Sequence, residues 1–131
     1  MHALIWPAVI TLLCVHLQLW TAYLVAKARG RYGIQAPATS GHPEFERAFR
    51  VQMNTLEASL MFLPALWVAA LFGTPAVVAV AGAVWLVGRV LYGVGYLRAA
   101  ARRSGGFVVA GFGLGALLLD GAIGLIRAAL A

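Results

Sequence analysis

The segment from Phe45 to Glu57 places charged and amide side chains at the start of an otherwise apolar, helix-forming stretch. Four of them follow one another at steps of three, four and three residues: Arg47, Arg50, Asn54 and Glu57. This spacing puts all four on one face of an α-helix. Guanidinium groups bind carboxylates, a carboxylate binds an ammonium group, and an amide satisfies peptide groups. The face predicts a site for a polar, charged ligand, and the alternative is a structural polar core in which acids and arginines pair.

A second stripe with the chemistry of a binding site lies further along the chain. Arg89, Tyr92 and Tyr96 recur at steps of three and four residues, and Arg103 follows seven residues later. Two phenols between two cations can hold a polar, anionic ligand, although tyrosines at this spacing are also typical of an interfacial aromatic belt or of core packing. Because ionisable residues inside membrane spans are costly, they usually mark functional sites.

The composition indicates that both stripes lie in membrane helices. Of the 131 residues, 63% are hydrophobic and 11% are charged, which is too few charges for a soluble domain of this size. A bilayer core takes about 20 apolar residues per helix. Four stretches are long enough, at about residues 3–26, 45–72, 75–101 and 107–130. The sequence predicts an all-α, integral, multi-pass membrane protein, with a single domain over residues 1–131 that forms a four-helix bundle.

Glycine, proline and serine mark the connections between these stretches. Residues 73–75 (Gly-Thr-Pro) predict one tight turn. Residues 104–106 (Ser-Gly-Gly) predict another, with Ser104 as the residue that ends the third helix. The region between the first two stretches, residues 27–44, predicts a long irregular loop.

Two features of the last stretch have structural interpretations. Gly111 and Gly115 are four residues apart, a spacing that permits close contact with another helix. Asp120 would be expensive in the bilayer without a partner, so we expect it to pair with Arg127 or with an arginine of another helix.

The net charge of +6 reflects membrane topology rather than nucleic-acid binding. Many basic residues gather after the first and third stretches: Lys27, Arg29, Arg31, Arg98, Arg102 and Arg103. By the positive-inside rule these regions are cytoplasmic, and both termini lie on the opposite side. No histidine or cysteine pair has the spacing of a zinc site, so no metal is expected.

Three segments resemble the MAPEG family, the membrane-associated proteins in eicosanoid and glutathione metabolism. They are APATSGHPE, FERAFRVQMNTLEASLMFLPALWVA and RVLYGVGYLRAAARR. The resemblance covers the chain from about Lys27 to Arg103, and the four-span layout extends it over the whole length. It is closest to the leukotriene C4 synthase and microsomal glutathione transferase branches.

The resemblance implies a homotrimer of four-helix subunits, with glutathione bound as cosubstrate between neighbouring subunits near one membrane face. One subunit would hold glutathione through Arg50, Asn54, Glu57, Tyr92 and Tyr96. The neighbouring subunit would complete the pocket with Arg29, Gln52 and Arg103. Arg103 would be the catalytic residue that activates the thiol, a role that suits arginine because it stays protonated.

The implied activity is that of a membrane-bound glutathione transferase acting in detoxification. The glutathione thiolate would attack lipophilic electrophiles from the bilayer, and lipid hydroperoxides are further candidate substrates. The membrane would be the inner membrane of a bacterium, or the endoplasmic reticulum or outer mitochondrial membrane of a eukaryote.

Two alternatives stay open within the same resemblance. A non-catalytic lipid-binding protein, like the five-lipoxygenase-activating protein, would bind lipid without consuming glutathione. A glutathione-dependent isomerase is suggested by Ser104, because the pair Arg103 and Ser104 resembles the prostaglandin E synthase branch. Ala58 stands where leukotriene C4 synthase has a tyrosine, which removes one aromatic contact and puts that branch's lipid specificity in question.

Overall fold

Four long helices make up nearly all of the computed structural model, which describes residues 4–131. They are α1 (Ile5–Tyr32), α2 (Pro43–Phe72), α3 (Pro75–Arg98) and α4 (Ser104–Leu130). A short 3-10 helix, η2 (Ala100–Arg103), joins α3 to α4. Each of the four spans is long and apolar enough to cross a membrane. The predicted all-α membrane architecture is therefore confirmed.

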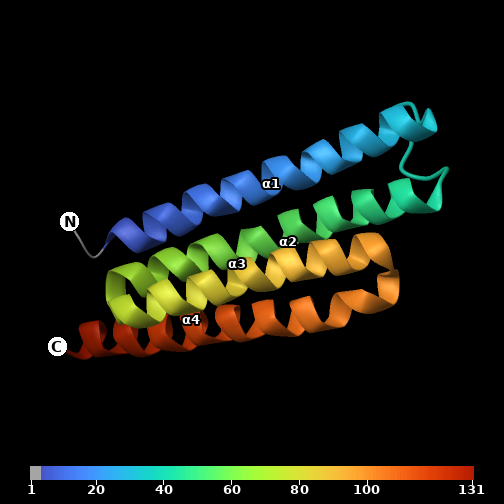
Figure 1. Ribbon diagram of the computed structural model, residues 1–131. Helices are drawn as coiled ribbons and strands as arrows, with labels where there is room; N and C mark the ends of the chain where they lie inside the picture. The colour runs from blue at the N-terminus through green and yellow to red at the C-terminus, as the bar shows by residue number, and fades with distance from the viewer. Residues whose placement is uncertain (1–3) are drawn as a thin grey trace.

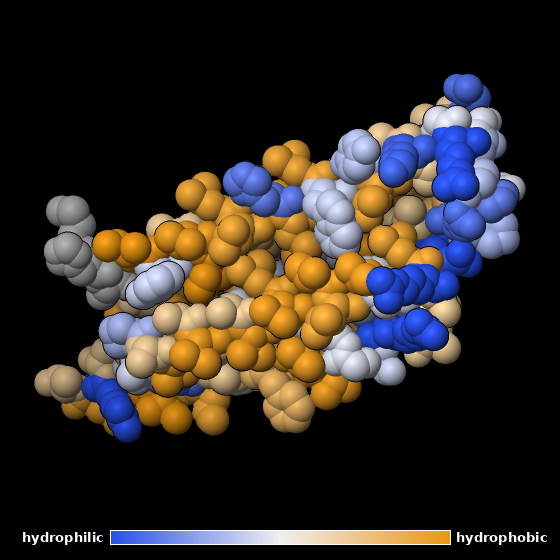
Figure 2. Space-filling model, viewed as in Figure 1, coloured by the Kyte–Doolittle hydropathy of each residue, from blue (hydrophilic) through white to orange (hydrophobic). Residues whose placement is uncertain are grey.

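The helices run side by side as an elongated bundle, with the α1–α2 and α3–α4 connections at one end (Figure 1). The beginning of α1 and the end of α4 lie at the other end. Hydrophilic residues gather mainly at the end that carries the two connections, whereas the visible flank of the bundle is largely hydrophobic (Figure 2). This distribution is that of a protein whose apolar sides face lipid and whose polar end faces water.

The first connection is shorter than the sequence predicts. Helix α1 continues through Lys27, Arg29 and Arg31 as far as Tyr32, so only residues 33–42 form the loop. The helix ends at Gly33, whose φ of 66° lies in the left-handed region that favours glycine, and whose N–H bonds to the carbonyl of Arg29. The charged residues end the apolar stretch but do not break the helix, since lysine and arginine are good helix formers.

The predicted turn at residues 73–75 is confirmed, and its backbone provides a hydrogen-bond partner for Asp120. The carboxylate of Asp120 accepts a hydrogen bond from the backbone N–H of Thr74, with Oδ2 and N 2.8 Å apart. Asp120 thereby satisfies a backbone donor at the start of α3. The partner predicted for Asp120 was an arginine, whereas the structure shows the backbone of Thr74. Gly73 makes room for this contact, because a Cβ there would lie 2.1 Å from Oδ2 of Asp120.

The second predicted turn is wrong. The chain reverses through residues 99–103, and Ser104 opens α4 instead of ending α3. Gly106 lies in the first turn of α4, where a Cβ would come within 2.1 Å of the backbone nitrogen of Tyr92. This glycine is needed for the close approach of α4 to α3, and not for a turn.

Similar contacts continue along the α3–α4 interface, which is the most extensive in the bundle. A Cβ at Gly88 would meet the backbone of Ala110 at 2.3 Å, and one at Gly113 would meet the carbonyl of Ala81 at 2.6 Å. At Gly111 and Gly115, which the sequence indicated as contact residues, a Cβ would meet no atom of the described residues within 4 Å. The close contact with α3 is therefore made by Gly113, which lies between them.

Aromatic stacking fills the core where the helices meet. The rings of Phe62 on α2 and Trp85 on α3 are parallel within 3° and their centroids lie 3.7 Å apart. Ile10 and Leu17 of α1 and Leu117 of α4 belong to the same buried cluster. This core fixes α2 against α3, and that contact sets the positions of the polar residues near the end of the bundle.

Candidate functional site

A polar cavity of about 380 Å³ opens where α2 begins, α3 ends and α4 begins. Its lining comprises Arg50, Asn54, Tyr92, Tyr96, Arg103, Ser104 and Phe107. The volume lies within the range of about 300–1,000 Å³ that is typical of small-molecule sites. The cavity joins the two stripes indicated by the sequence, since α2 supplies the first two of these residues and α3 the tyrosines.

Helix α2 begins about two turns before Arg50 and three before Asn54, and so presents its polar face to the cavity. His42 caps the helix by accepting a hydrogen bond from the backbone N–H of Glu44 at 3.2 Å, and Pro43 occupies the first turn. Arg50 is exposed and Asn54 is half-buried, as expected for two residues four apart that point into an open cavity. Arg47 is held outside the cavity by a hydrogen bond from Nε to the carbonyl of Leu97, at 3.2 Å.

The tyrosines of α3 form the opposite wall. Tyr92 is only 3% exposed, and its ring centroid lies 5.6 Å from that of Tyr96. The guanidinium carbon of Arg103, on η2, lies 5.6 Å from the ring centroid of Tyr96. The resemblance implied that Arg103 reaches the site from the neighbouring subunit, whereas here it lines the same cavity as the tyrosines of its own chain.

The electrostatics of the cavity favour an anion. Two arginines, Arg50 and Arg103, are the charged groups among the described residues that line it. Helix α4 begins at Ser104 on the cavity wall, so the positive end of its dipole acts in the same direction. Phenol and amide groups supply neutral hydrogen-bond partners beside these charges. The arrangement can bind a carboxylate or stabilise a thiolate.

Three of the expected binding residues lie away from this cavity. Arg29 donates from Nη1 to the carbonyl of Ala38 at 2.8 Å, and its guanidinium lies 4.7 Å from the ring centroid of Phe45, so it holds the α1–α2 loop. Gln52 lines a different cavity, between α1 and α2. Glu57 is exposed, further along α2. A single chain thus brings together Arg50, Asn54, Tyr92, Tyr96 and Arg103, but not these three.

A second polar cavity of about 490 Å³ lies beside the first, and the two share Arg50 and Tyr96 as walls. The loop before α2 contributes Thr39 and Ser40, and the first turns of α2 contribute Pro43, Glu46, Arg47 and Phe49. This outer cavity carries a carboxylate as well as arginines. The pair of cavities can therefore accommodate a ligand with charges of both signs along its length.

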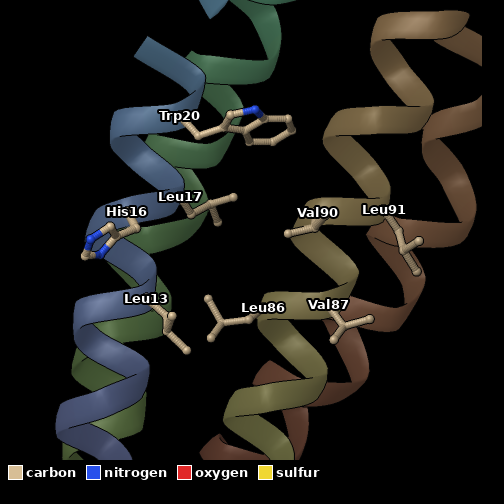
Figure 3. A pocket seen from close by; sticks show the side chains of 8 residues that line it. All are labelled: Leu13, His16, Leu17, Trp20, Leu86, Val87, Val90 and Leu91. Carbon is tan, nitrogen blue, oxygen red and sulfur yellow. The ribbon is translucent and has the colours of Figure 1, made fainter. Parts of the chain in front are cut away.

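An apolar groove of about 490 Å³ between α1 and α3 has a different character. Leu13, Leu17 and Trp20 of α1 face Leu86 and Val90 of α3 across it (Figure 3). His16 belongs to the lining, but the described residues expose almost no polar surface there, so the groove suits an apolar ligand better than a charged one. Among the cavities of the described chain, the polar pair at the end of the bundle is the candidate functional site.

Ser104 and Arg89 lie elsewhere than the sequence predicts, and Phe107 is a residue of the site that the sequence did not indicate. Ser104, expected to end a helix, lines the cavity, as does Phe107 one turn later. Arg89 was expected on the same ligand-binding stripe as Tyr92 and Tyr96, but it does not line the cavity of the described chain. In the structure it contacts Asn54 and Tyr92 from behind the cavity.

A comparison with protein families matches residues 7–123 of the chain to the MAPEG family model. The chain belongs to the MAPEG family. The matched range includes every residue of the polar cavity, so the MAPEG assignment applies to the site and not only to the apolar helices. Together with its four long apolar helices, membership of MAPEG makes the chain an integral, multi-pass membrane protein.

Several known proteins resemble this MAPEG chain over most of its length. A Synechocystis protein described as uncharacterized is 49% identical over 106 residues, covering 81% of this chain and 77% of its own. Leukotriene C4 synthase of Rattus norvegicus is 39% identical over 119 residues, or 91% of this chain and 79% of that protein. Human microsomal glutathione S-transferase 2 is 38% identical over 118 residues, or 90% and 80% of the two chains.

Proposed function

We propose that this protein is a membrane-bound glutathione transferase, which activates the thiol of glutathione for attack on lipophilic electrophiles. The cavity that brings Arg50 and Arg103 together with Asn54, Tyr92 and Tyr96 carries the proposal. The names of its relatives, leukotriene C4 synthase and microsomal glutathione S-transferase 2, support a glutathione-related transferase role.

The chemistry of glutathione matches that of the two polar cavities. The tripeptide has two carboxylates, one ammonium group, two peptide bonds and a thiol. Arg50 offers a forked donor to a carboxylate, while Asn54 and the tyrosine hydroxyls bond to peptide groups. Glu46, in the outer cavity, is a carboxylate within reach of the same ligand region. Arginines on two sides of one cavity suit a ligand that is anionic overall.

Arg103 is the proposed catalytic residue. Its guanidinium stays protonated at physiological pH, so it favours the thiolate over the thiol and lowers the pKa of bound glutathione. Each unit of depressed pKa corresponds to about 1.4 kcal/mol. The thiol proton leaves to water, the sulfur forms a bond to the electrophilic carbon, and the displaced group or opened oxygen takes the electron pair. The protein contributes binding, orientation and electrostatic stabilisation.

The position of the cavity provides a route for each substrate. Its outer neighbour opens among loop residues at the hydrophilic end of the bundle, where glutathione arrives from water. Phe107 lines its other side and is 59% exposed on the apolar flank of α4, where a lipophilic electrophile arrives from the bilayer. The sulfur and the electrophilic carbon would meet between these two openings.

A homotrimer is part of the proposal. Glu57 and Gln52 project from α2 outside the cavity, and Glu57 is exposed within a membrane-spanning helix. A carboxylate facing lipid in an isolated chain is costly, so a neighbouring subunit is the natural partner for this face. In a homotrimer, residues outside the cavity of one chain, Arg29 among them, would contact glutathione held by the next.

Ser104 supports a second candidate, a glutathione-dependent isomerase. Its hydroxyl lies on the cavity wall, directly after Arg103, and can donate to a thiolate or to a substrate oxygen. An isomerase would use glutathione without consuming it, while a reduction of lipid hydroperoxides would convert it to the disulfide. Products and glutathione balance therefore separate these reactions from conjugation.

The test is glutathione consumption by the detergent-purified protein with a generic aryl halide electrophile, comparing Arg103→Ala with Arg102→Ala. Arg102 is the neighbouring exposed arginine and does not line the cavity, so it controls for loss of charge on η2. We expect Arg103→Ala to lose most conjugation and most thiolate absorbance of bound glutathione, while Arg102→Ala keeps both. Equal turnover in the two variants would remove Arg103 from the mechanism. Binding without turnover, across electrophiles and hydroperoxides, would favour a non-catalytic lipid-binding protein.

A further inference from the structure

Arg89 is a buried cation in the membrane-spanning part of α3. It is 2% exposed and donates from Nη2 to Oδ1 of Asn54 at 3.1 Å and to Oγ1 of Thr55 at 2.8 Å. Its Nε atom is buried and has no hydrogen-bond partner among residues 4–131. Both acceptors are neutral, so they do not neutralise the charge. A charge held at this cost in a span indicates a function beyond packing.

The contact with Arg89 determines which way the amide of Asn54 points. A guanidinium group has only donors, so the atom of Asn54 that faces it must be the carbonyl oxygen. The NH₂ group of the amide is then the half of the side chain that remains for the cavity, which Asn54 lines. Asn54 is therefore fixed as a hydrogen-bond donor toward a ligand and cannot turn over to accept.

Arg89 also contacts the opposite wall of the cavity. Its guanidinium carbon lies 4.2 Å from the ring centroid of Tyr92, which is close enough for a cation–π interaction. Tyr92 is 3% exposed and lines the cavity. One buried side chain thus contacts a cavity residue on α2 and another on α3.

We propose that Arg89 is the positioning residue of the glutathione site: it presents the Asn54 amide as an obligate donor to a carboxylate or peptide carbonyl of the ligand and holds Tyr92 beside it. The proposal rests on the proposed function, because it assigns the polarity of contacts in that cavity. It also predicts which ligand group meets Asn54. The ammonium group of glutathione is excluded there, since it can only donate.

The substitution Asn54→Asp separates positioning from structure. The carboxylate keeps an acceptor for Arg89, and it adds an opposite charge, so the fold should be preserved. The donor toward the cavity is lost and an acceptor replaces it. Loss of a hydrogen bond to a charged group corresponds to about a ten- to hundredfold effect, so glutathione affinity should fall by that factor. The melting temperature should not fall.

Arg89→Met tests the other partner, because methionine keeps much of the length of the side chain without its donors or charge. We expect glutathione affinity to fall about tenfold or more, and Arg89→Lys to recover only part of it, since a compact ammonium group lacks the planar guanidinium that lies over the Tyr92 ring. Ser59→Ala is the matched control. Ser59 is also buried on α2, one turn beyond Thr55. It accepts a hydrogen bond from Nε2 of Gln18 at 2.6 Å and donates one to the carbonyl of Thr55 at 2.8 Å, and within the described residues it has no hydrogen bond to Arg89.

Isothermal titration with glutathione and thermal unfolding in detergent give the two readouts for each variant. The proposal expects weak binding with an intact fold in Asn54→Asp, and normal binding in Ser59→Ala. Unchanged affinity in Asn54→Asp would overturn it, even if Arg89→Met failed to fold. If the unaltered chain does not bind glutathione, both the proposed function and this inference are wrong. If the unaltered chain binds glutathione and both Asn54→Asp and Arg89→Met bind it with the same affinity, only this inference is wrong.

Discussion

Replacing Gly106 by alanine tests how the α3–α4 contact sets the shape of the cavity. The new Cβ would lie 2.1 Å from the backbone nitrogen of Tyr92, whereas the shortest ordinary van der Waals distance is 3.4 Å. The difference is 1.3 Å, and backbone atoms cannot rotate away as a side chain can. Helix α4 must therefore move from α3 by about that distance. Overpacking of this kind costs about 1–3 kcal/mol of unfolding free energy.

The displacement falls at the site itself. Ser104 and Phe107 lie on either side of Gly106 and line the cavity with Tyr92. We expect Gly106→Ala to lower both the melting temperature in detergent and the affinity for glutathione. Gly105→Ala is the control, because a Cβ there meets nothing within 4 Å and alanine favours the helix by up to about 1 kcal/mol. Equal melting temperatures and affinities in the two variants would refute the argument.

Two further predictions concern the bundle. Asp120→Ala should lower the free energy of unfolding by about 0.5–2 kcal/mol, because the N–H of Thr74 loses its acceptor, and Asp120→Asn should lower it less because an amide oxygen still accepts. Thermal unfolding of the three proteins checks the order, and an equal loss in both variants would contradict it. Phe62→Ala should lower the free energy of unfolding by about 3–5 kcal/mol, since it empties space against Trp85, whereas Phe112→Ala, at a position 74% exposed, should change it little. Equal effects of the two phenylalanine substitutions would contradict the assigned core.

The sequence predicted the four spans because their signal is local. Each requires about 20 apolar residues in succession, and hydropathy reports that directly. The same measure placed the end of the first helix too early. Lys27, Arg29 and Arg31 end the apolar stretch, but the helix continues on its own backbone hydrogen bonds until Gly33. Where a helix leaves the membrane and where it ends are separate properties.

Glycine was the hardest residue to interpret from the sequence. Two glycines after Ser104 resembled a turn, yet Gly106 packs against the backbone of α3. Near the middle of α4, the spacing drew attention to Gly111 and Gly115, while Gly113 makes the contact. The first error arises because a missing side chain permits either a bend or a close neighbour, and the second because spacing does not show which glycines face the partner helix. Both questions depend on the rotation of the helix relative to its partner, and that is a tertiary property.

The site was predictable as two stripes but not as one cavity. Helical spacing correctly grouped Arg50 with Asn54, and Tyr92 with Tyr96. The same spacing also included Glu57, which is exposed outside the cavity. Whether a residue on the right face reaches the cavity depends on its depth along the helix, and the offset of α2 against α3 decides that depth. The role of Arg89 as the link between the stripes depends on the same offset.

The location of the polar cavity at the end of the bundle has a kinetic consequence. If the proposed function is correct, the relevant concentration of glutathione is its amount per volume of water, and that of the electrophile is its amount per amount of lipid. Adding empty vesicles or detergent would dilute the electrophile within its own phase while leaving the glutathione concentration unchanged. The apparent KM for the electrophile would then rise with the amount of lipid, and that for glutathione would stay constant. The rate would follow the mole fraction of electrophile in the membrane, so the enzyme would respond most strongly to compounds that partition into lipid.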